Sequence, residues 1–185
     1  MTSTSPLKAA IEIIRYPSPY GSGALLWQGG LLTGHLLPGS RQIRNIARGL
    51  SAAPAAKAGA LAVKLESYFQ GERVEFREGE LPVDWSAGGP FQEKVRRALA
   101  EIPYGEAVSY ADLAGAAGHP RAHRAVGNVM AANSIPVLLP CHRVIRSDGR
   151  PGGFTAGEDW KSRLLEIEGL RLPPPFRRAR ESNKL

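Results

Sequence analysis

The first part of the chain carries short apolar runs of strand length, separated by turn residues. One run extends from Ile11 to Tyr16, and two more, Ala24–Gln28 and Leu31–Leu37, flank the pair Gly29-Gly30. Glycine reaches positive φ without steric cost, so this pair suits the tight turn of a β-hairpin. The pattern predicts strands here, the last two joined as a hairpin.

Helical spacing follows. The apolar positions from 58 to 69 lie three and four residues apart, and Gly71 is expected to end this helix. The segment 79–90 contains two prolines and three glycines and is the natural linker. We therefore expect a mixed α/β domain over residues 1–78 and a second domain over 91–172.

The second domain reads as mainly helical. Apolar residues within 91–102 form one stripe, ended by Pro103 and Gly105. A second helix is announced by the capping-box-like spacing of Ser109 and Asp112, and it closes near Gly118. The expected fold class is α/β (α+β).

A third helix is expected to begin with Pro120 in its first turn, a favoured place for proline. Two short helices joined by a glycine-containing segment are compatible with a helix-turn-helix. The apolar face of this third helix is expected to consist of Ala122, Ala125, Val126, Val129 and Met130.

The other face of the third helix combines basic and small residues. Arg121, Arg124 and Asn128 lie among residues that include Ala125 and Gly127. Glycine inside a helix costs about 1 kcal/mol relative to alanine. Small residues beside basic ones permit close approach of the backbone to a phosphate-lined groove. The alternative is a solvated face with tight helix–helix packing.

Charge is a weaker guide. The chain has 24 Lys and Arg against 17 Asp and Glu, a net charge of +7, which suits a polyanionic partner. However, +4 of this charge lies in residues 171–185, and the basic tail 173–185 is expected to be disordered. Charge alone therefore does not decide for nucleic acid.

The remaining composition excludes several classes of protein. No stretch approaches the roughly 20 apolar residues of a membrane span, and the start lacks the layout of a signal peptide. A single cysteine excludes an internal disulfide and, with four histidines, argues against structural zinc. We expect a cytoplasmic monomer with no metal and no cofactor.

The single cysteine, Cys141, stands in the run Pro140-Cys141-His142-Arg143-Val144, after the apolar stretch Ile135–Leu139. That stretch is expected to be a buried strand or support. A thiol attacks as its thiolate, and a neighbouring imidazole can take the proton. Adjacent side chains of an extended strand point to opposite faces, so a turn or a bridging water is required. A lone cysteine is otherwise usually inert filling of the core.

This run resembles the active-site signature of the O6-alkylguanine-DNA alkyltransferases. The resemblance extends from Pro90 through Ile102-Pro103-Tyr104-Gly105-Glu106, Arg124-Ala125-Val126-Gly127-Asn128 and Asn133 to Glu168. It implies transfer of an alkyl group from O6-alkylguanine, or O4-alkylthymine, to the cysteine, once per molecule. It also implies a ribonuclease H-like N-terminal domain and a winged helix-turn-helix-like C-terminal domain.

For DNA binding, the resemblance implies that the third helix enters the minor groove of double-stranded DNA with little sequence preference. Arg124 matches the arginine that takes the place of the displaced guanine, with Arg121, Ala125, Gly127, Asn128 and Tyr110 as further contacts. The protein would then be associated with the nucleoid.

For catalysis, the resemblance implies a water between Cys141 and His142, with Glu168 behind the imidazole. Asn133 would support a tight turn, although a helix C-cap is an equally physical role. Tyr110, a phenol with an ordinary pKa of about 10, would donate a proton to the leaving purine.

The base pocket is expected to involve Phe154, Thr155, Pro140 and Ser134. Phe154 stands where the family commonly has tyrosine, and Ala156 where glycine is usual, so a positive φ at Ala156 would be strained. We expect both changes to tune rate and substrate size without abolishing transfer.

Three other functions are compatible with parts of this pattern. A non-reactive lesion binder of the alkyltransferase-like type usually lacks the cysteine. A Cys-His-Glu hydrolase needs an oxyanion hole, and no glycine-flanked nucleophile turn is present. A transcription regulator would use only the helix-turn-helix and bind one sequence tightly.

Overall fold

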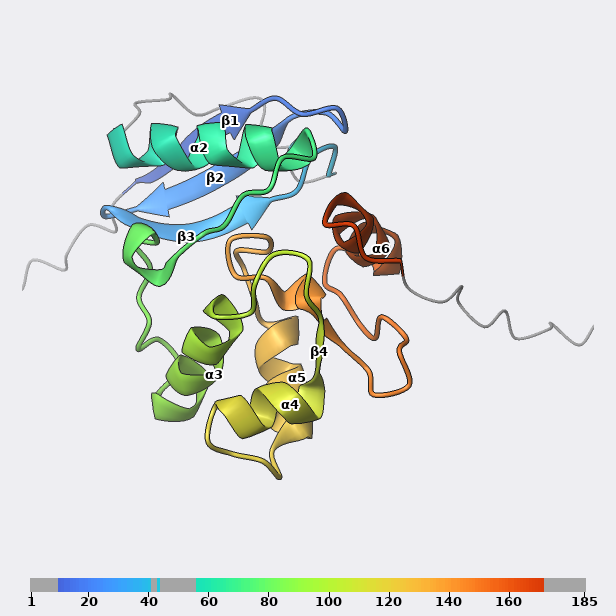
Figure 1. Cartoon of the computed structure of the whole chain (residues 1–185). Helices are drawn as coiled ribbons and strands as arrows, with labels where there is room; N and C mark the ends of the chain where they lie inside the picture. The colour runs from blue at the N-terminus through green and yellow to red at the C-terminus, as the bar shows by residue number, and fades with distance from the viewer. Residues whose placement is uncertain (1–9, 41–42, 44–55, 172–185) are drawn as a thin grey trace, which may run out of the picture.

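The computed structural model describes residues 10–40, 43 and 56–171, so the expected basic tail 173–185 lies outside the described residues. The N-terminal part is an antiparallel sheet with strands in the order β1-β2-β3, covered on one face by α2 (Figure 1). Its elements are β1 (Ile11–Tyr16), β2 (Gly23–Gln28), β3 (Leu31–Leu36) and α2 (Ala56–Phe69).

The predicted strands and hairpin are confirmed. Gly29 and Gly30 have φ angles of 59° and 81°, and they join β2 to β3 with Gln28 opposite Leu31. The predicted helix is α2. It ends at Phe69, and Gly71 follows with a φ of 90°. The α/β class expected from the sequence is confirmed as well.

A short 3-10 turn, η1 (Glu78–Glu80), and the segment 81–89 connect this sheet to the C-terminal part. There, α4 packs on α5, and β4 pairs in parallel with β5. The elements are α3 (Pro90–Ala100), β4 (Val108–Ser109), α4 (Tyr110–Ala116), α5 (His123–Ala131), η2 (Cys141–Arg143), β5 (Val144–Ile145) and α6 (Glu158–Ile167).

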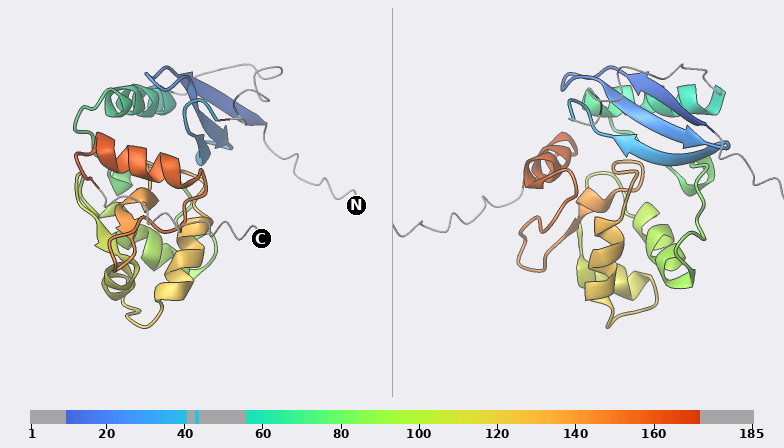
Figure 2. Two further views of the ribbon diagram at one scale, coloured as in Figure 1. Left: turned by 90° about the vertical axis from the view of Figure 1, so that its right-hand side faces the viewer. Right: turned by 180° about the vertical axis from the view of Figure 1, so that it is seen from behind.

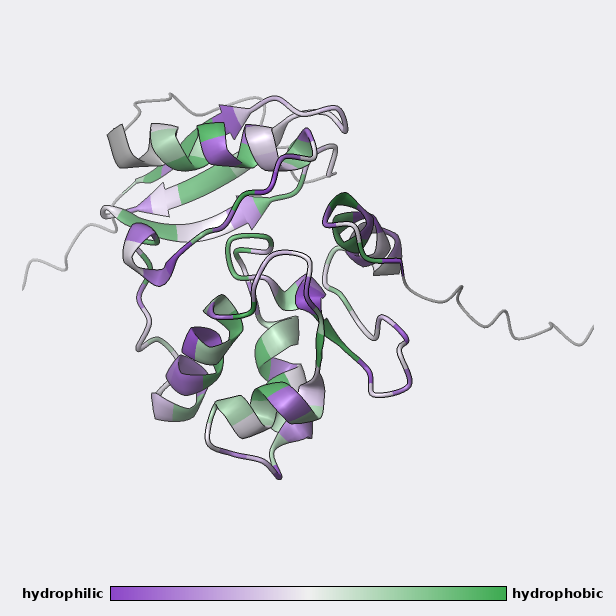
Figure 3. Cartoon of the chain, in the orientation of Figure 1, coloured by the Kyte–Doolittle hydropathy of each residue, from purple (hydrophilic) through white to green (hydrophobic). Residues whose placement is uncertain are grey.

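One hydrophobic core runs through both parts of the chain. Leu25 of the sheet, Leu65 of α2, Leu99 of α3 and Leu138 are each completely buried and belong to the same cluster. Figures 2 and 3 show the sheet with α2 as one layer, helices α3 to α5 as another, and a largely hydrophobic loop between them. The loop that leads to the cysteine is therefore held between the two layers.

Two sequence-based expectations in the C-terminal part are wrong. Pro120 is not in the first turn of α5, which begins at His123. Instead, the amide of Ala122 donates to the carbonyl of His119 (2.9 Å), and Pro120 takes the second place of that turn, which suits its fixed φ. Ala125 is exposed and does not belong to the apolar face of the helix.

The stretch Ile135–Leu139 is buried support but not a strand. The amide of Leu139 donates to the carbonyl of Ile135 (3.0 Å), and Pro136 and Leu139 form only an isolated bridge. Prolines have no N–H for a ladder, and Val137 has a φ of 73°, which interrupts extended backbone. The stretch is a tight turn.

Helix α4, which begins at Tyr110, depends on its capping box. Ser109 Oγ accepts from the amide of Asp112 (3.1 Å), and Asp112 Oδ2 accepts from the amide of Ser109 (3.0 Å). These bonds satisfy amides that a helix start would otherwise leave free.

We expect Ser109→Ala to lower the free energy of unfolding by about 1 kcal/mol, because it removes one of these acceptors. Denaturant unfolding of the two proteins measures the difference. Ser147→Ala, in the exposed turn after β5, is the matched control and should change nothing. Equal losses in both variants would contradict the role of the cap.

Candidate active site

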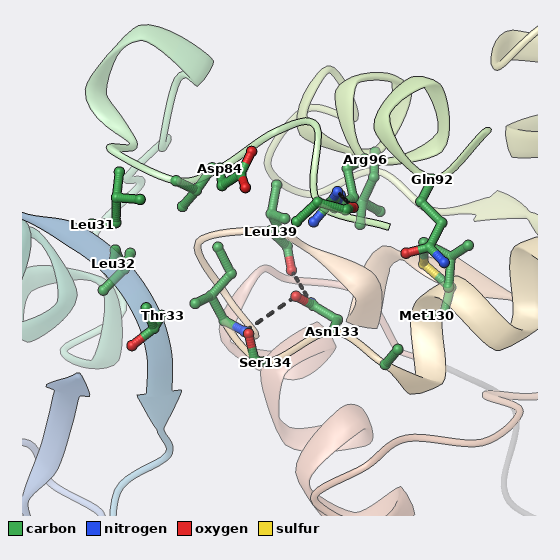
Figure 4. A pocket seen from close by; sticks show the side chains of 16 residues that line it. Leu31, Leu32, Thr33, Asp84, Gln92, Arg96, Met130, Asn133, Ser134 and Leu139 are labelled. Atoms are coloured by element: carbon green, nitrogen blue, oxygen red, sulfur yellow. Dashed lines mark hydrogen bonds between the residues drawn. The ribbon is translucent and has the colours of Figure 1, made fainter. Parts of the chain in front are cut away.

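Cys141 begins the 3-10 turn η2 and is almost completely buried. Asn133 Nδ2 donates to the carbonyl of Leu139 and to Cys141 Sγ, both at 2.9 Å, while its Oδ1 accepts from the amide of Ile135 (3.2 Å). Figure 4 shows two of these bonds, to the carbonyl of Leu139 and from the amide of Ile135, which hold the turn. The C-cap of α5 is Ala132, so the helix C-cap that was the alternative for Asn133 is wrong, and its role is in the turn.

His142 is completely buried, and its Nε2 lies 2.8 Å from Glu168 Oε1. Since a carboxylate only accepts, Nε2 carries the proton and Nδ1 is left as an acceptor. Nδ1 is buried and has no hydrogen-bond partner among the described residues. Burial lowers the pKa of His142 despite the carboxylate, so the imidazole is neutral and able to accept a proton.

Glu168 is the acceptor on which this arrangement converges. Arg143 approaches it with both Nε and Nη2 at 2.9 Å, Tyr68 donates its hydroxyl at 2.9 Å, and the amide of Gly105 donates at 3.1 Å. Burial alone would raise the pKa of Glu168, but the bonds from His142 and Arg143 hold that pKa at about 2. Glu168 is therefore ionised.

Arg143 and Tyr68 were not among the site residues expected from the sequence. Arg143 directly follows the Cys-His pair, and this position in the sequence could have identified it as a site residue. Tyr68 falls on the apolar stripe of α2, where an aromatic residue reads as core. Its contact with Glu168 joins residues 100 positions apart and has no local signature.

The thiol itself rests neutral. Burial raises the pKa of Cys141 to about 11, although the Asn133 hydrogen bond and the charge of Lys161 favour the thiolate. Lys161 is completely buried, and its Nζ donates to the carbonyl of Val144 (2.5 Å). Attack by sulfur thus requires removal of a proton during the reaction.

Tyr110 lies at the start of α4 and is half-buried. Burial, and then the negative charge of a Cys141 thiolate, raise its pKa. The phenol therefore keeps its proton and can act as a donor. A Cβ on Gly152 would lie 3.1 Å from the Tyr110 hydroxyl, so the 150s loop passes close to it.

A cavity of about 510 Å³ opens beside Cys141. Among the residues expected at the base pocket, Phe154, Thr155 and Ser134 line it, whereas Pro140 does not. Ala156 also lines it and is absent from the residues with positive φ, so the strain that a positive φ would bring does not arise there. The other lining residues are His35, Leu36, Leu37, Ser40, Asn133, Pro136 and Trp160.

Helix α5 lies at the front of the molecule in the rear view of Figure 2. Arg121, just before the helix, and Arg124, Ala125 and Asn128 on it are exposed. A Cβ added to Gly127 would meet nothing within 4 Å. Tight helix–helix packing therefore does not explain this glycine, and an open surface of small and basic residues remains.

Within the described residues, no helix is long and apolar enough to cross a membrane.

Acid should destabilise this protein. Burial lowers the pKa of His142, and it lowers that of His35 to about 4 from 6.5, so the unfolded chain binds more protons below pH 6.5. The free energy of unfolding should fall between pH 6.5 and 4, by on the order of 3 kcal/mol from His35 alone. Below pH 4.5, the unfolded chain also protonates Glu168, whose pKa in the folded protein is about 2, and this adds to the loss of stability.

Urea unfolding at a series of pH values measures this dependence. The loss should persist at high salt, because buried groups are poorly screened. A free energy of unfolding that stays constant or rises from pH 6.5 to 4.5 would contradict the assignment of neutral, buried histidines.

Comparisons with known proteins show which family the chain resembles. The family described as 6-O-methylguanine DNA methyltransferase, DNA binding domain, matches residues 90–170. A constitutive methylated-DNA–protein-cysteine methyltransferase of Bacillus subtilis is 46% identical over 108 residues, 58% of this chain and 63% of that protein, so less than two thirds of its length is spanned. One from Mycolicibacterium paratuberculosis is 43% identical over 120 residues, 65% of this chain and 70% of the relative.

Solved structures extend the similarity to the N-terminal part. The crystal structure of Mycobacterium tuberculosis O6-methylguanine methyltransferase has a TM-score of 0.68 at 36% identity, covering 89% of this chain and 96% of that one. The same organism's protein in complex with DNA gives 0.66 at 37%, covering 85% and 91%. On these grounds the chain belongs to the methylated-DNA–protein-cysteine methyltransferases, the O6-alkylguanine-DNA alkyltransferase family.

Proposed function

We propose that this protein repairs double-stranded DNA by moving an alkyl group from O6 of guanine to Cys141. The observation that carries the proposal is the buried Cys141 beside a cavity, with an amide on its sulfur and a neutral histidine next in the chain. The similarity to methyltransferases, one of them solved with DNA, supports it.

The first step concerns access to the lesion. The O6 position lies inside the duplex, so the nucleotide has to rotate out at a cost of a few kcal/mol. The exposed face of α5 can lie in the minor groove, where small residues let the backbone approach and Arg121 contacts phosphate. Arg124 would fill the space left by the base. These contacts are to the backbone and the stack, so little sequence preference is expected.

The second step activates sulfur. We propose that a water joins Cys141 Sγ to Nδ1 of His142, the buried nitrogen whose lone pair is available. The thiol proton passes to the imidazole, and Glu168 stabilises the resulting imidazolium. Asn133 Nδ2 stabilises the thiolate through its bond to sulfur.

The third step is substitution at the alkyl carbon. A sulfur–carbon bond forms as the carbon–O6 bond breaks, and the electron pair passes to the purine. Tyr110 donates its phenolic proton to the purine and recovers a proton from solvent, while the imidazolium of His142 releases its proton to solvent. Guanine therefore leaves neutral, and both side chains return to their starting states. The product is a thioether, which has no proton to exchange and no easy leaving group. Each molecule therefore reacts once.

Intact-protein mass after incubation with a duplex that contains one O6-methylguanine tests the proposal. We expect one added methylene, saturating at one equivalent of DNA, and no mass change in Cys141→Ala. Lesion-dependent binding without a mass change would favour a non-reactive binder. Repeated turnover of an ester would favour a hydrolase. The absence of both reaction and binding would exclude DNA repair.

Arg124→Ala should slow transfer from duplex DNA by about 10- to 100-fold, because no side chain then fills the space that the displaced base leaves in the stack. Misplacement of reacting groups causes rate losses of about this size. Rapid-quench measurement of methyl transfer gives the rate. Arg73→Ala changes an exposed arginine in the segment after α2; it is the matched control and should react like the original protein. A normal rate in Arg124→Ala would contradict its role in base displacement.

A further inference from the structure

His35 of β3 connects the N-terminal sheet to the turn that carries the cysteine. Its amide donates to the carbonyl of Ser134 (2.8 Å), and its Nδ1 lies 2.5 Å from the carbonyl of Pro136. On the other side of the ring, Nε2 lies 2.5 Å from the hydroxyl of Tyr16. The side chain also lines the cavity beside Cys141.

The partners fix the protonation of this ring. A backbone carbonyl only accepts, so Nδ1 carries the proton, and Nε2 accepts from the Tyr16 hydroxyl. Both nitrogens of a neutral imidazole are thereby used. His35 is 3% exposed, and burial lowers its pKa to about 4, so this neutral form persists at physiological pH.

The turn to which His35 is hydrogen-bonded contains a residue with an unfavourable backbone conformation. Val137, directly after Pro136, has a φ of 73° and is buried. A β-branched residue rarely adopts this conformation, which persists only where the surroundings enforce it. Among the described residues, Val137 is the only non-glycine with positive φ.

The same turn sets the position of the sulfur. Asn133 bridges its two ends by contacts to Leu139 and Cys141, and His35 holds the carbonyls of Ser134 and Pro136 between them. An apolar side chain at position 35 would fill the space without a polar atom to satisfy. A polar ring there is explained by the carbonyl that it binds.

We propose that His35 is a positioning residue for alkyl transfer, which holds the turn 133–141 in the conformation that places Asn133 on Cys141 Sγ. This proposal rests on the proposed function. Because the hydrogen bonds come from β3 and β1, it makes the N-terminal sheet part of the reactive apparatus. Errors of about 1 Å in such an alignment can cost about 100-fold in rate.

The test measures transfer of a methyl group from an O6-methylguanine duplex as a function of protein concentration. This separates the maximal rate constant from the concentration at half-maximal rate. We expect His35→Leu to lower the maximal rate by about 10- to 100-fold, with the half-maximal concentration and the affinity for lesion-containing DNA unchanged, because α5 is not altered.

His35→Asn should restore the rate to within about threefold, since its amide can donate where Nδ1–H does, and a purely steric role would give no such rescue. Tyr16→Phe leaves Nε2 without its donor and should give an intermediate loss, which keeps the proposal testable if His35→Leu does not fold. Ile13→Ala is the matched control: it removes buried surface from a separate cluster of the sheet and should leave the rate unchanged.

Several outcomes would overturn the proposal. One is that folded His35→Leu and Tyr16→Phe react as fast as the original protein. Another is that His35→Asn is as slow as His35→Leu, or that Ile13→Ala slows the reaction equally. If the original protein transfers no methyl group at all, the proposed function fails first, and the two failures are thus distinguishable.

Discussion

The buried carboxylate of Glu168 is the constraint on which the structure depends. A charge away from water is tolerated only when it is paired and fully hydrogen-bonded. Here the donors come from α2 (Tyr68), the segment before β4 (Gly105) and η2 (His142 and Arg143). Satisfying one anion therefore brings three distant parts of the chain together. The same bonds fix the tautomer of His142.

The N-terminal part contributes to the site, although the motifs by which the sequence resembles the family begin only at Pro90. Tyr68 reaches Glu168 behind His142, and His35 reaches the turn before Cys141, so the supports of both residues are contacted from the N-terminal part. The shared hydrophobic core has the same consequence for stability. Loss of packing at the sheet residues that belong to this core would be felt at the cysteine, although the residues proposed to do the chemistry all follow position 100.

The sequence predicted those parts of the structure that local physics determines. The Gly29-Gly30 hairpin and the capping box of α4 depend on residues close in sequence, so their patterns could be read directly. The start of α5 could not, because Pro120 suits a helix and a turn equally well. Val137 gave no sign of its positive φ, since only the tertiary surroundings enforce it.

The state of the Cys141 thiol has a further consequence. Peroxides and small soluble alkylating agents react with thiolates, and a thiol whose pKa is about 11 is almost entirely protonated in the cell. Under the proposed function each molecule reacts only once, so each accidental reaction would consume a molecule. Burial of the sulfur would thus act as storage under this proposal, because the nucleophile stays protonated and unreactive until a lesion occupies the cavity and its proton can leave.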